Sequence, residues 1–446
     1  MEIFIKESTM VFPAQETPKH CLQTCDLDLL VPAAHIPAVH FYRRPNDSSN
    51  FFEAGSLKEA LSKVLVPFYP MAGRLGKDEN GRLEIHCNGE GVLFIEAETN
   101  CVIDDFGDFT SNFNLVELVP TFDYTKDVSS YPLLGIQVTH FKCGGACFGI
   151  RFHHTLGDAT SKYRFINSWA KMTRGLPITI PPVIDRTVLR VGVPTSPAFH
   201  HIEYDLPPSI NTPTQNIELQ SNPGSFCTII LNLSLHQINY LKEQSKHGST
   251  GKYSRLEILA AHIWRCMCKA RGLSSDQASK LHIPLNGRSR LNPPIPPEYI
   301  GNVVFTAAAM ALSGDILSEP LNSTVERVHR TLKRMDDAYL KSALAYLNQQ
   351  PDPTGLRRGA HTFKSPNLNV VKLNDMPIHD ANFGWGKPVF ARPVNASFEG
   401  IAYILGSPTS DGSLSVVVNI ETHHAKLFEK LFYDVFLKHQ NARSKY

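Results

Sequence analysis

A histidine and an aspartate, His154 and Asp158, lie four residues apart where an alternating apolar segment gives way to a turn. Phe148, Ile150 and Phe152 occupy every second position before them. Because successive side chains of a strand point to opposite faces, His154 continues the apolar, inward face. A histidine at the buried end of a strand is well placed to remove a proton from a substrate, since its ordinary pKa is about 6.5. The alternative is a core histidine satisfied by a hydrogen bond, which is the commoner case for a single histidine, so other parts of the chain must decide.

The segments around this pair predict the elements that position it. Residues 134–141 and 146–152 are predicted to form two paired strands around the turn Cys143-Gly144-Gly145. After Asp158, apolar residues repeat at helical spacing as far as Gly175, which suits a helix end. These apolar residues are Phe165, Ile166, Trp169 and Met172.

Further elements are predicted on both sides of this unit. In the first half, residues 1–10 and 35–42 are predicted strands, and the capping box Ser56-Leu57-Lys58-Glu59 predicts a helix start. Frequent prolines between 176 and 225 indicate a long crossover. In the second half, the predicted elements are a strand at 226–233, a helix opened by the capping box Ser254-Arg255-Leu256-Glu257, a long helix at 323–348, strands near 400–406 and 413–420, and a last helix through Leu427, Leu431, Phe432 and Val435.

Length and composition limit the fold class. A chain of 446 residues with 42% hydrophobic and 19% charged residues is globular and too long for one ordinary core. We therefore expect a first domain at 1–175, the crossover at 176–225 and a second domain at 226–446. Strands and helices follow each other in no strict order, so the predicted class is mixed α/β, with α+β character.

Several functions do not fit the sequence. The formal net charge of +2 gives no attraction to nucleic acid or to a membrane surface. The nine cysteines include no CxxC pair, so neither a metal site nor a disulfide framework is predicted. No GxGxxG, GxxxxGK[ST] or GxSxG motif is present, and the N-terminus lacks the apolar run of a signal peptide. We expect a cytoplasmic monomer that acts on small molecules.

A second stretch, NFGWGKP at 382–388, combines two glycines, a tryptophan and a proline. This composition favours a tight, ordered loop, and packing between domains would account for most of it. Its tryptophan, Trp385, also offers an indole N–H, which donates a hydrogen bond but cannot accept one.

HxxxD at His154 and Asp158, NFGWG at 382–386 and YPMAGR at 69–74 together resemble the BAHD acyltransferases of plants, over essentially the whole chain. HxxxD alone is a weak signal, whereas HxxxD in mid-chain with xFGWG in the last sixth is a strong one. The sequence resembles in particular the hydroxycinnamoyl-CoA:shikimate/quinate hydroxycinnamoyltransferases and the rosmarinic acid synthases. The stretches that carry this resemblance are KESTM at 6–10, AQETP at 14–18, GEGVL at 89–93, FKCGG at 141–145 and RGAHTFK at 358–364.

The resemblance implies two chloramphenicol-acetyltransferase-like domains that face each other across a channel open at both ends. Acyl-CoA, the co-substrate, would enter from one side and the acceptor from the other. His154 would take the proton of an acceptor hydroxyl or amine as it attacks the thioester carbonyl, and the indole of Trp385 would stabilise the oxyanion. Asp158 would point away from the reaction, pair with Arg288 or Arg290 and support the turn. No metal or covalent acyl-enzyme is required.

The resemblance also suggests where CoA and the loop are held. Ser254 and Arg255 are candidates for binding the CoA phosphates. The loop at 382–386, with Gly384 and Gly386, would be structural, but it begins with Asn382 where the family usually has Asp. An amide can still form hydrogen bonds, but it lacks the negative charge that would pair with an arginine. The role that the family gives this loop therefore does not transfer directly to this chain.

The acceptor side departs further from the family. Shikimate-type members carry an arginine that clamps the acceptor carboxylate, and Asp375 stands at that place here. In the stretch HIPAVH at 35–40, His35 is kept, Ile36 and Ala38 replace two hydroxyls, and His40 replaces a phenol. Aspartate in place of arginine inverts the local field, which would reject a carboxylate and attract a cation. We therefore expect an acceptor other than shikimate or quinate: an amine, or a neutral alcohol such as a sugar or a phenylethanoid.

Two other classes of function fit the same residues. A non-catalytic relative that binds an aromatic ligand would account for Asn382 and the altered acceptor residues. An enzyme that uses His154 for a different step, such as a cyclisation, would show no dependence on CoA. Release of CoA with a panel of acceptors, compared with a His154→Ala variant, distinguishes these alternatives from acyl transfer.

Overall fold

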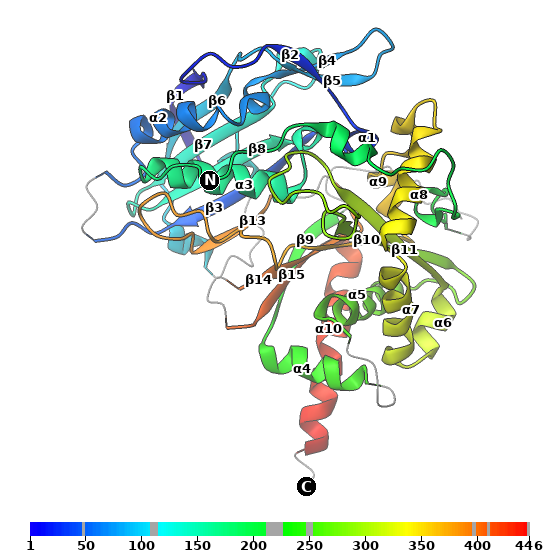
Figure 1. Ribbon diagram of the computed structural model, residues 1–446. Coiled ribbons are helices and arrows are strands. Elements are labelled where there is room, and N and C mark those ends of the chain that lie inside the picture. Colours follow the sequence, from blue (N-terminus) through cyan, green and yellow to red (C-terminus); the bar gives the residue numbers. More distant parts are fainter. Residues whose placement is uncertain are drawn as a thin grey trace.

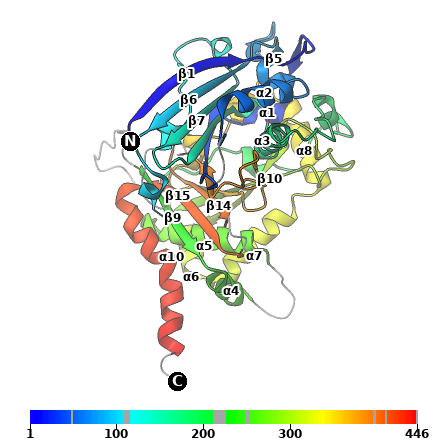
Figure 2. The same ribbon diagram turned by 90° about the vertical axis from the view of Figure 1, so that its left-hand side faces the viewer.

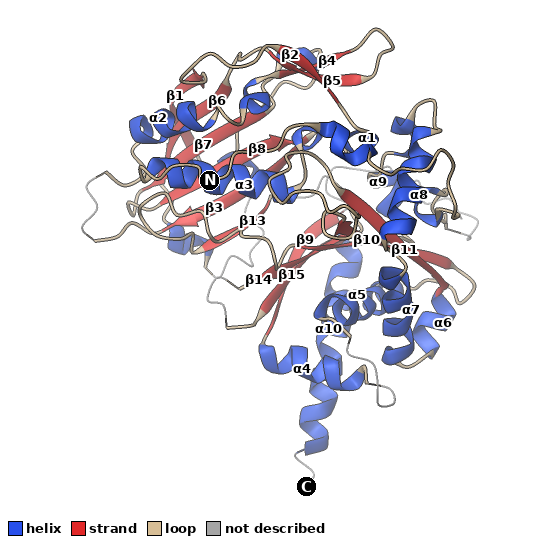
Figure 3. Ribbon diagram, viewed as in Figure 1, coloured by secondary structure: helices blue, strands red, loops and turns tan. Residues whose placement is uncertain are grey.

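Two six-stranded sheets organise the computed structural model (Figures 1 and 3). The structure describes residues 1–46, 50–107, 115–210, 226–246, 253–394, 398–407 and 411–443, the last six of these through their backbone alone. The first sheet has the strand order β1-β6-β7-β8-β3-β13. These strands are β1 (Ile3–Val11), β6 (Val92–Thr99), β7 (Leu134–Phe141), β8 (Ala146–His153), β3 (His35–Tyr42) and β13 (Phe390–Pro393).

The second sheet has the strand order β11-β10-β12-β14-β15-β9. Its strands are β11 (Val304–Leu312), β10 (Ala278–Asn286), β12 (Leu368–Lys372), β14 (Ile401–Gly406), β15 (Leu414–Glu421) and β9 (Phe226–Leu233). Both sheets combine parallel and antiparallel pairs, because β6–β7, β10–β12 and β12–β14 are parallel. The predicted mixed fold is therefore confirmed. A small third sheet holds β2 (His20–Gln23), β5 (Leu83–Cys87) and β4 (Arg74–Lys77).

Several helices pack against the two large sheets (Figure 1). On the first sheet, α2 (Ala54–Val64) packs against α3 (Ala159–Thr173), and the indole of Trp169 donates to the carbonyl of Leu57 at 3.0 Å. The second sheet is covered by α5 (Arg255–Ala270), α7 (Leu321–Lys333) and α10 (Thr422–Arg443). Helix α10 extends away from the rest of the molecule (Figure 2). The remaining helices are α1 (Asp26–Leu30), α4 (Leu235–Gln244), α6 (Ser313–Ser318), α8 (Asp337–Asn348) and α9 (Ala360–Phe363).

The two predicted capping boxes have different outcomes. The predicted box at Ser254 caps α5, since its hydroxyl accepts from the N–H of Glu257 at 3.3 Å. The prediction at Ser56 is wrong. The carboxylate of Glu53 caps α2 instead, accepting from the N–H groups of Gly55 at 2.8 Å and Ser56 at 2.6 Å.

The predicted long helix at 323–348 is two helices, α7 and α8. The helix is interrupted before Asp336, which is the N-cap of α8. Its carboxylate accepts a hydrogen bond from the N–H of Tyr339 at 3.0 Å. The apolar stripe continues through the break because Met335 stays buried. Spacing alone therefore did not reveal the turn.

The two sheets do not coincide with the predicted domains. Strand β13 belongs to the predicted second domain, yet it completes the first sheet by pairing antiparallel with β3, with Ala391 opposite His40. Conversely, Leu27 and Leu30 pack in the core of the second sheet. Part of the predicted crossover, residues 211–225, lies outside the described residues.

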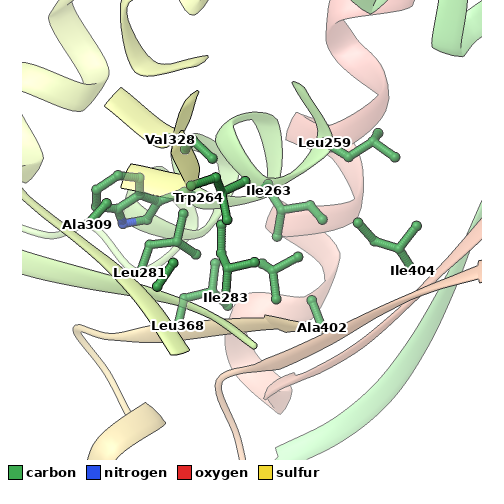
Figure 4. Packing of buried hydrophobic residues seen from close by; sticks show 14 of the residues in the cluster. Leu259, Ile263, Trp264, Leu281, Ile283, Ala309, Val328, Leu368, Ala402 and Ile404 are labelled. Atoms are coloured by element: carbon green, nitrogen blue, oxygen red, sulfur yellow. The ribbon is translucent and has the colours of Figure 1, made fainter. Parts of the chain in front are cut away.

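The core of the second sheet is centred on α5 (Figure 4). Ile263 and Trp264 of this helix lie beside Leu281 and Ile283 of β10, and Leu259 belongs to the same cluster. This core fixes β10 and the neighbouring strands, and these strands form one wall of the site described below.

Three further observations concern membranes, cysteines and metals. No helix within the described ranges is long and apolar enough to cross a membrane. The nine cysteines are free. On the small sheet, Cys21, Glu84 and His86 bring potential ligand atoms within 4.8 Å of one another.

Candidate active site

A cavity of about 300 Å³ is lined by both halves of the chain. From the first sheet come Ile36 and Pro37 of β3, and Phe152 and His154 at the end of β8; from the second come residues of β10, β11, β12 and β14. Phe152 and His154 share this face, as strand alternation predicts. His153 is not among the lining residues, and its ring contacts that of His35 at a centroid distance of 5.0 Å.

His154 faces the cavity from the short turn that follows β8. Its Nδ1 is buried and forms no well-aligned hydrogen bond with a described residue. Burial is the largest influence on its pKa and lowers it; the charge of Lys162 lowers it further, and that of Asp158 raises it. The imidazole is therefore neutral at pH 7 and able to accept a proton.

Backbone contacts fix the position of His154. Its N–H donates to the carbonyl of Ala34 at 3.0 Å, and its carbonyl accepts from the side-chain amide of Asn302 at 2.8 Å. Gly157 follows in a place without room for a side chain, because a Cβ there would lie 2.6 Å from the Cβ of Ser161. The turn can adopt this path only with glycine at 157.

Asp158 holds the turn to the second half of the chain. Arg288 donates to it twice, Nη1 to Oδ2 at 2.7 Å and Nη2 to Oδ1 at 3.1 Å, and both side chains are buried. The same carboxylate caps α3 through the N–H of Ser161 at 3.1 Å and accepts from the N–H of Val303 at 3.0 Å. Arg290, the other predicted partner, donates to two backbone carbonyls near the end of α7.

A second buried ion pair also supports the turn, and no sequence motif indicates it. Asp28 of α1 pairs with Arg186, which donates to the carbonyl of Leu156 at 3.2 Å. Asp28 also accepts from the side chain of Asn302 at 2.9 Å. The three residues are far apart in the chain, and none belongs to a motif, so only the fold reveals them.

The predicted acceptor residues of β3 divide into two groups. His35 and Ile36 line the cavity, while Ala38 and His40 are buried outside its lining. Both nitrogens of His35 are engaged, Nε2 with the carbonyl of Pro132 at 2.8 Å and Nδ1 with the hydroxyl of Tyr124 at 3.0 Å. Burial lowers the pKa of His35 and of His40 to about 3, so neither carries a charge at pH 7.

Asp375 does not line the cavity, contrary to the acceptor role predicted for it. It is exposed, pairs with Lys372 and accepts from the side chain of Asn374 at 2.7 Å. Lys372, in contrast, does line the cavity. The expected inversion of charge at the acceptor is therefore not what this geometry shows.

Three other predicted residues also lie outside the cavity lining. Trp385 is half-buried against Phe51 and Phe52, with ring centroids 5.9 and 5.2 Å away, so this geometry does not support its predicted role as oxyanion donor. Ser254 is engaged in capping α5, and Arg255 is exposed. Neither of these two is positioned by this geometry as a CoA ligand.

Asn382 has a clear structural role in the loop at 382–388. Its side-chain oxygen accepts from the N–H of Gly384 at 2.9 Å and from that of Gly386 at 3.1 Å. Both glycines have positive φ, of 116° and 99°, which suits a tight loop. An amide oxygen makes these bonds as a carboxylate would, so the departure from the family at 382 leaves the loop intact.

Asn382→Ala should therefore lower the free energy of unfolding by about 1–2 kcal/mol, because two backbone donors lose their acceptor. Asn382→Asp keeps an oxygen at that position and should change it by less than about 0.5 kcal/mol. Urea unfolding followed by tryptophan fluorescence measures both. Equal destabilisation by the two substitutions would show that the two hydrogen bonds do not stabilise the loop.

Solved structures share this fold. The crystal structure of vinorine synthase superposes with a TM-score of 0.75 at 20% identity, covering 97% of this chain and 98% of that one. A likeness at this level of identity concerns the fold.

Sequence comparison defines the family. The transferase family model matches residues 1–435. A shikimate O-hydroxycinnamoyltransferase of Nicotiana tabacum is 52% identical over 435 residues, covering 97% of this chain and 100% of the relative. A hydroxycinnamoyl-CoA:5-hydroxyanthranilate N-hydroxycinnamoyltransferase of Avena sativa is 45% identical over 441 residues, at 97% and 100% coverage. The chain therefore belongs to the BAHD acyltransferases, the transferase family that its HxxxD and xFGWG motifs indicated.

Proposed function

We propose that the protein transfers a hydroxycinnamoyl-type acyl group from a CoA thioester to the hydroxyl or amine of a small acceptor, with His154 as general base. The observation that carries the proposal is a neutral imidazole that faces a cavity lined by both halves of the chain. The relatives named above support the acyl donor, and they include both an O- and an N-acyltransferase.

In the proposed reaction, Nε2 of His154 accepts the proton of the attacking hydroxyl or amine. The new bond forms between that oxygen or nitrogen and the thioester carbonyl carbon, and the C–S bond then breaks. The CoA thiolate leaves and recovers the proton from the imidazolium, which restores the neutral base. Asp158 takes no part in proton transfer, because Arg288 and two backbone N–H groups occupy its oxygens. Its role is to hold the turn.

The test is a CoA-release assay with purified protein and p-coumaroyl-CoA. The acceptors are shikimate, quinate, 4-hydroxyphenyllactate, 5-hydroxyanthranilate, tyramine, spermidine and a phenylethanoid glucoside. We expect release that depends on an acceptor, with the matching ester or amide found by mass spectrometry. A protein that binds these compounds and releases no CoA would be a non-catalytic relative, and a product formed without CoA would indicate a different use of His154.

The acid limb of the pH–rate profile should lie below pH 6.5. Burial lowers the pKa of His154 below the ordinary value of 6.5. The imidazole therefore stays neutral as the pH falls to 6.5, and it is lost as a base by protonation only at lower pH. We expect kcat/KM for p-coumaroyl-CoA to be level from pH 7 to 8 and to decline at acidic pH with a midpoint under 6.5. Circular dichroism over the same range separates this effect from unfolding. A midpoint at or above 6.5 would contradict the description of His154 as a base shielded from water.

A further inference from the structure

The cavity carries cations that the mechanism does not use. Lys162, Arg358 and Lys372 all line it, whereas the one acidic side chain of the described lining, Asp158, is paired with Arg288. Lys372 has a partner in Asp375.

Arg358 also has electrostatic support. Burial lowers its pKa, and the carboxylate of Glu203 opposes that effect. Lys162 has no such support. Burial lowers its pKa to about 8, and no nearby carboxylate opposes this effect. At pH 7 its ammonium group is therefore mostly charged, and it lies inside a cavity.

The position of Lys162 directs this charge at the reacting centre. It lies in the first turn of α3, four residues after Asp158, and is only 5% exposed. Its Nζ lies 4.8 Å from the centroid of the Tyr163 ring, and both side chains line the cavity. The charge is close enough to His154 to depress the pKa of that imidazole. A small acceptor could therefore contact both residues at once.

A buried, unpaired ammonium group is costly unless something else supplies the countercharge. The ring of Tyr163 supplies part of it through a cation–π contact. Within the described part of the chain no carboxylate supplies the rest. The missing partner is then an anion that enters the cavity with a substrate.

We propose that Lys162 binds a carboxylate of the acceptor and thereby selects acceptors that carry both a carboxylate and a hydroxyl or amine. The proposal rests on the proposed function, because it names the acceptor class for the same cavity. It replaces the expectation based on Asp375, which is exposed and is not among the residues that line the cavity. The recognition charge thus comes from the helix that follows the HxxxD turn rather than from the segment before the NFGWG loop.

The experiment compares matched acceptors that differ by one charge. Shikimate is paired with its methyl ester, 5-hydroxyanthranilate with its methyl ester, and 4-hydroxyphenyllactate with its methyl ester, each with p-coumaroyl-CoA. Binding of each compound is also measured by calorimetry without acyl-CoA, so that the readout does not require turnover. The variants are Lys162→Met, which keeps the length of the side chain, and Lys162→Arg, which keeps the charge. Lys171→Met, an exposed lysine of the same helix, is the control.

For wild type we expect at least one carboxylate to be preferred over its ester, in Kd and in kcat/KM. Lys162→Met should weaken that carboxylate roughly 10- to 100-fold and leave the ester within about threefold, since a hydrogen bond to a charged group is lost. Lys162→Arg should restore most of the preference, and Lys171→Met should not alter it. In Lys162→Met the acid limb of the pH profile should also move to higher pH, because a cation near His154 is gone.

The outcomes separate this inference from the proposed function. Acyl transfer to amines or esters with no preference for a carboxylate, or a preference that survives in Lys162→Met, would overturn the role of Lys162 and leave the transferase intact. Carboxylate binding that depends on Lys162 in a protein that releases no CoA would support the subsite and reject the transferase. Carboxylates that bind no better than their esters, with or without turnover, would overturn the inference.

Discussion

Replacing His154 with alanine is expected to lower kcat/KM for acyl transfer about 10²- to 10⁴-fold, the range that a positioned general base contributes. The imidazole faces the cavity, and burial keeps it neutral at pH 7 by lowering its pKa. Without it the acceptor must lose its proton to water during attack on the thioester. Initial rates of CoA release from p-coumaroyl-CoA, with the best acceptor of the panel, measure the loss. The loss should be in kcat, with KM for p-coumaroyl-CoA changed by no more than a few-fold, because the ring removes a proton rather than binding CoA.

Two controls make the result specific. His236→Ala removes an exposed histidine of α4 and should retain wild-type activity. Added imidazole should restore part of the rate of His154→Ala, because the substitution leaves space beside the cavity for the free base. A His154→Ala protein that is folded and keeps more than about a tenth of the wild-type rate would rule out this histidine as the base.

Asp158→Ala should be the most destabilising single substitution at the site, lowering the free energy of unfolding by about 3–5 kcal/mol. It leaves Arg288, itself only 5% exposed, without its carboxylate partner. It also removes the N-cap of α3 and the acceptor for the N–H of Val303. Because this carboxylate joins the HxxxD turn to the second half of the chain, activity should fall together with stability. Urea unfolding of the variant gives the magnitude.

The matched control is Asp336→Ala, since Asp336 is also a helix N-cap, at α8, but is exposed. Loss of a cap alone should cost about 1 kcal/mol. The double substitution Asp158→Ala with Arg288→Met should recover part of the loss, because it removes the unpaired charge as well. If the two aspartate substitutions cost the same, the ion pair with Arg288 adds nothing beyond capping.

Local patterns predicted the part of the fold that carries His154. The paired strands at 134–141 and 146–152 and the helix after Asp158 match β7, β8 and α3 within a residue or two. These elements follow one another in the chain and are joined by short turns. The alternating burial pattern of the strands and the 3.6-residue pattern of the helix are therefore enough to specify them. The pairing of Asp158 with Arg288 or Arg290 was implied by the family resemblance and not by a local pattern, and the structure selects Arg288, 130 residues further along the chain.

Features that depend on distant contacts were not predicted from the sequence. Strand β13 completes a sheet whose other strands all lie before residue 154, and no local signal marks it as an edge strand there. The pair of Asp28 and Arg186 joins segments 158 residues apart. The sequence does not mark Lys162 as a site residue. The spacing of polar residues along a helix is the same whether that face of the helix borders solvent or a cavity. The roles of Trp385 and Asp375 were inferred from their place in a motif, and placement in the fold separates both from the cavity.

The most direct test of the account is a crystal structure of the protein with a non-hydrolysable thioether analogue of p-coumaroyl-CoA and a carboxylate-bearing acceptor. We predict that the acceptor hydroxyl or amine lies within hydrogen-bond distance of Nε2 of His154, with the carbon that mimics the thioester carbonyl beside it in the cavity. Ligands bound elsewhere, with the imidazole of His154 in contact with neither, would contradict the central claim that acyl group and acceptor meet at this residue.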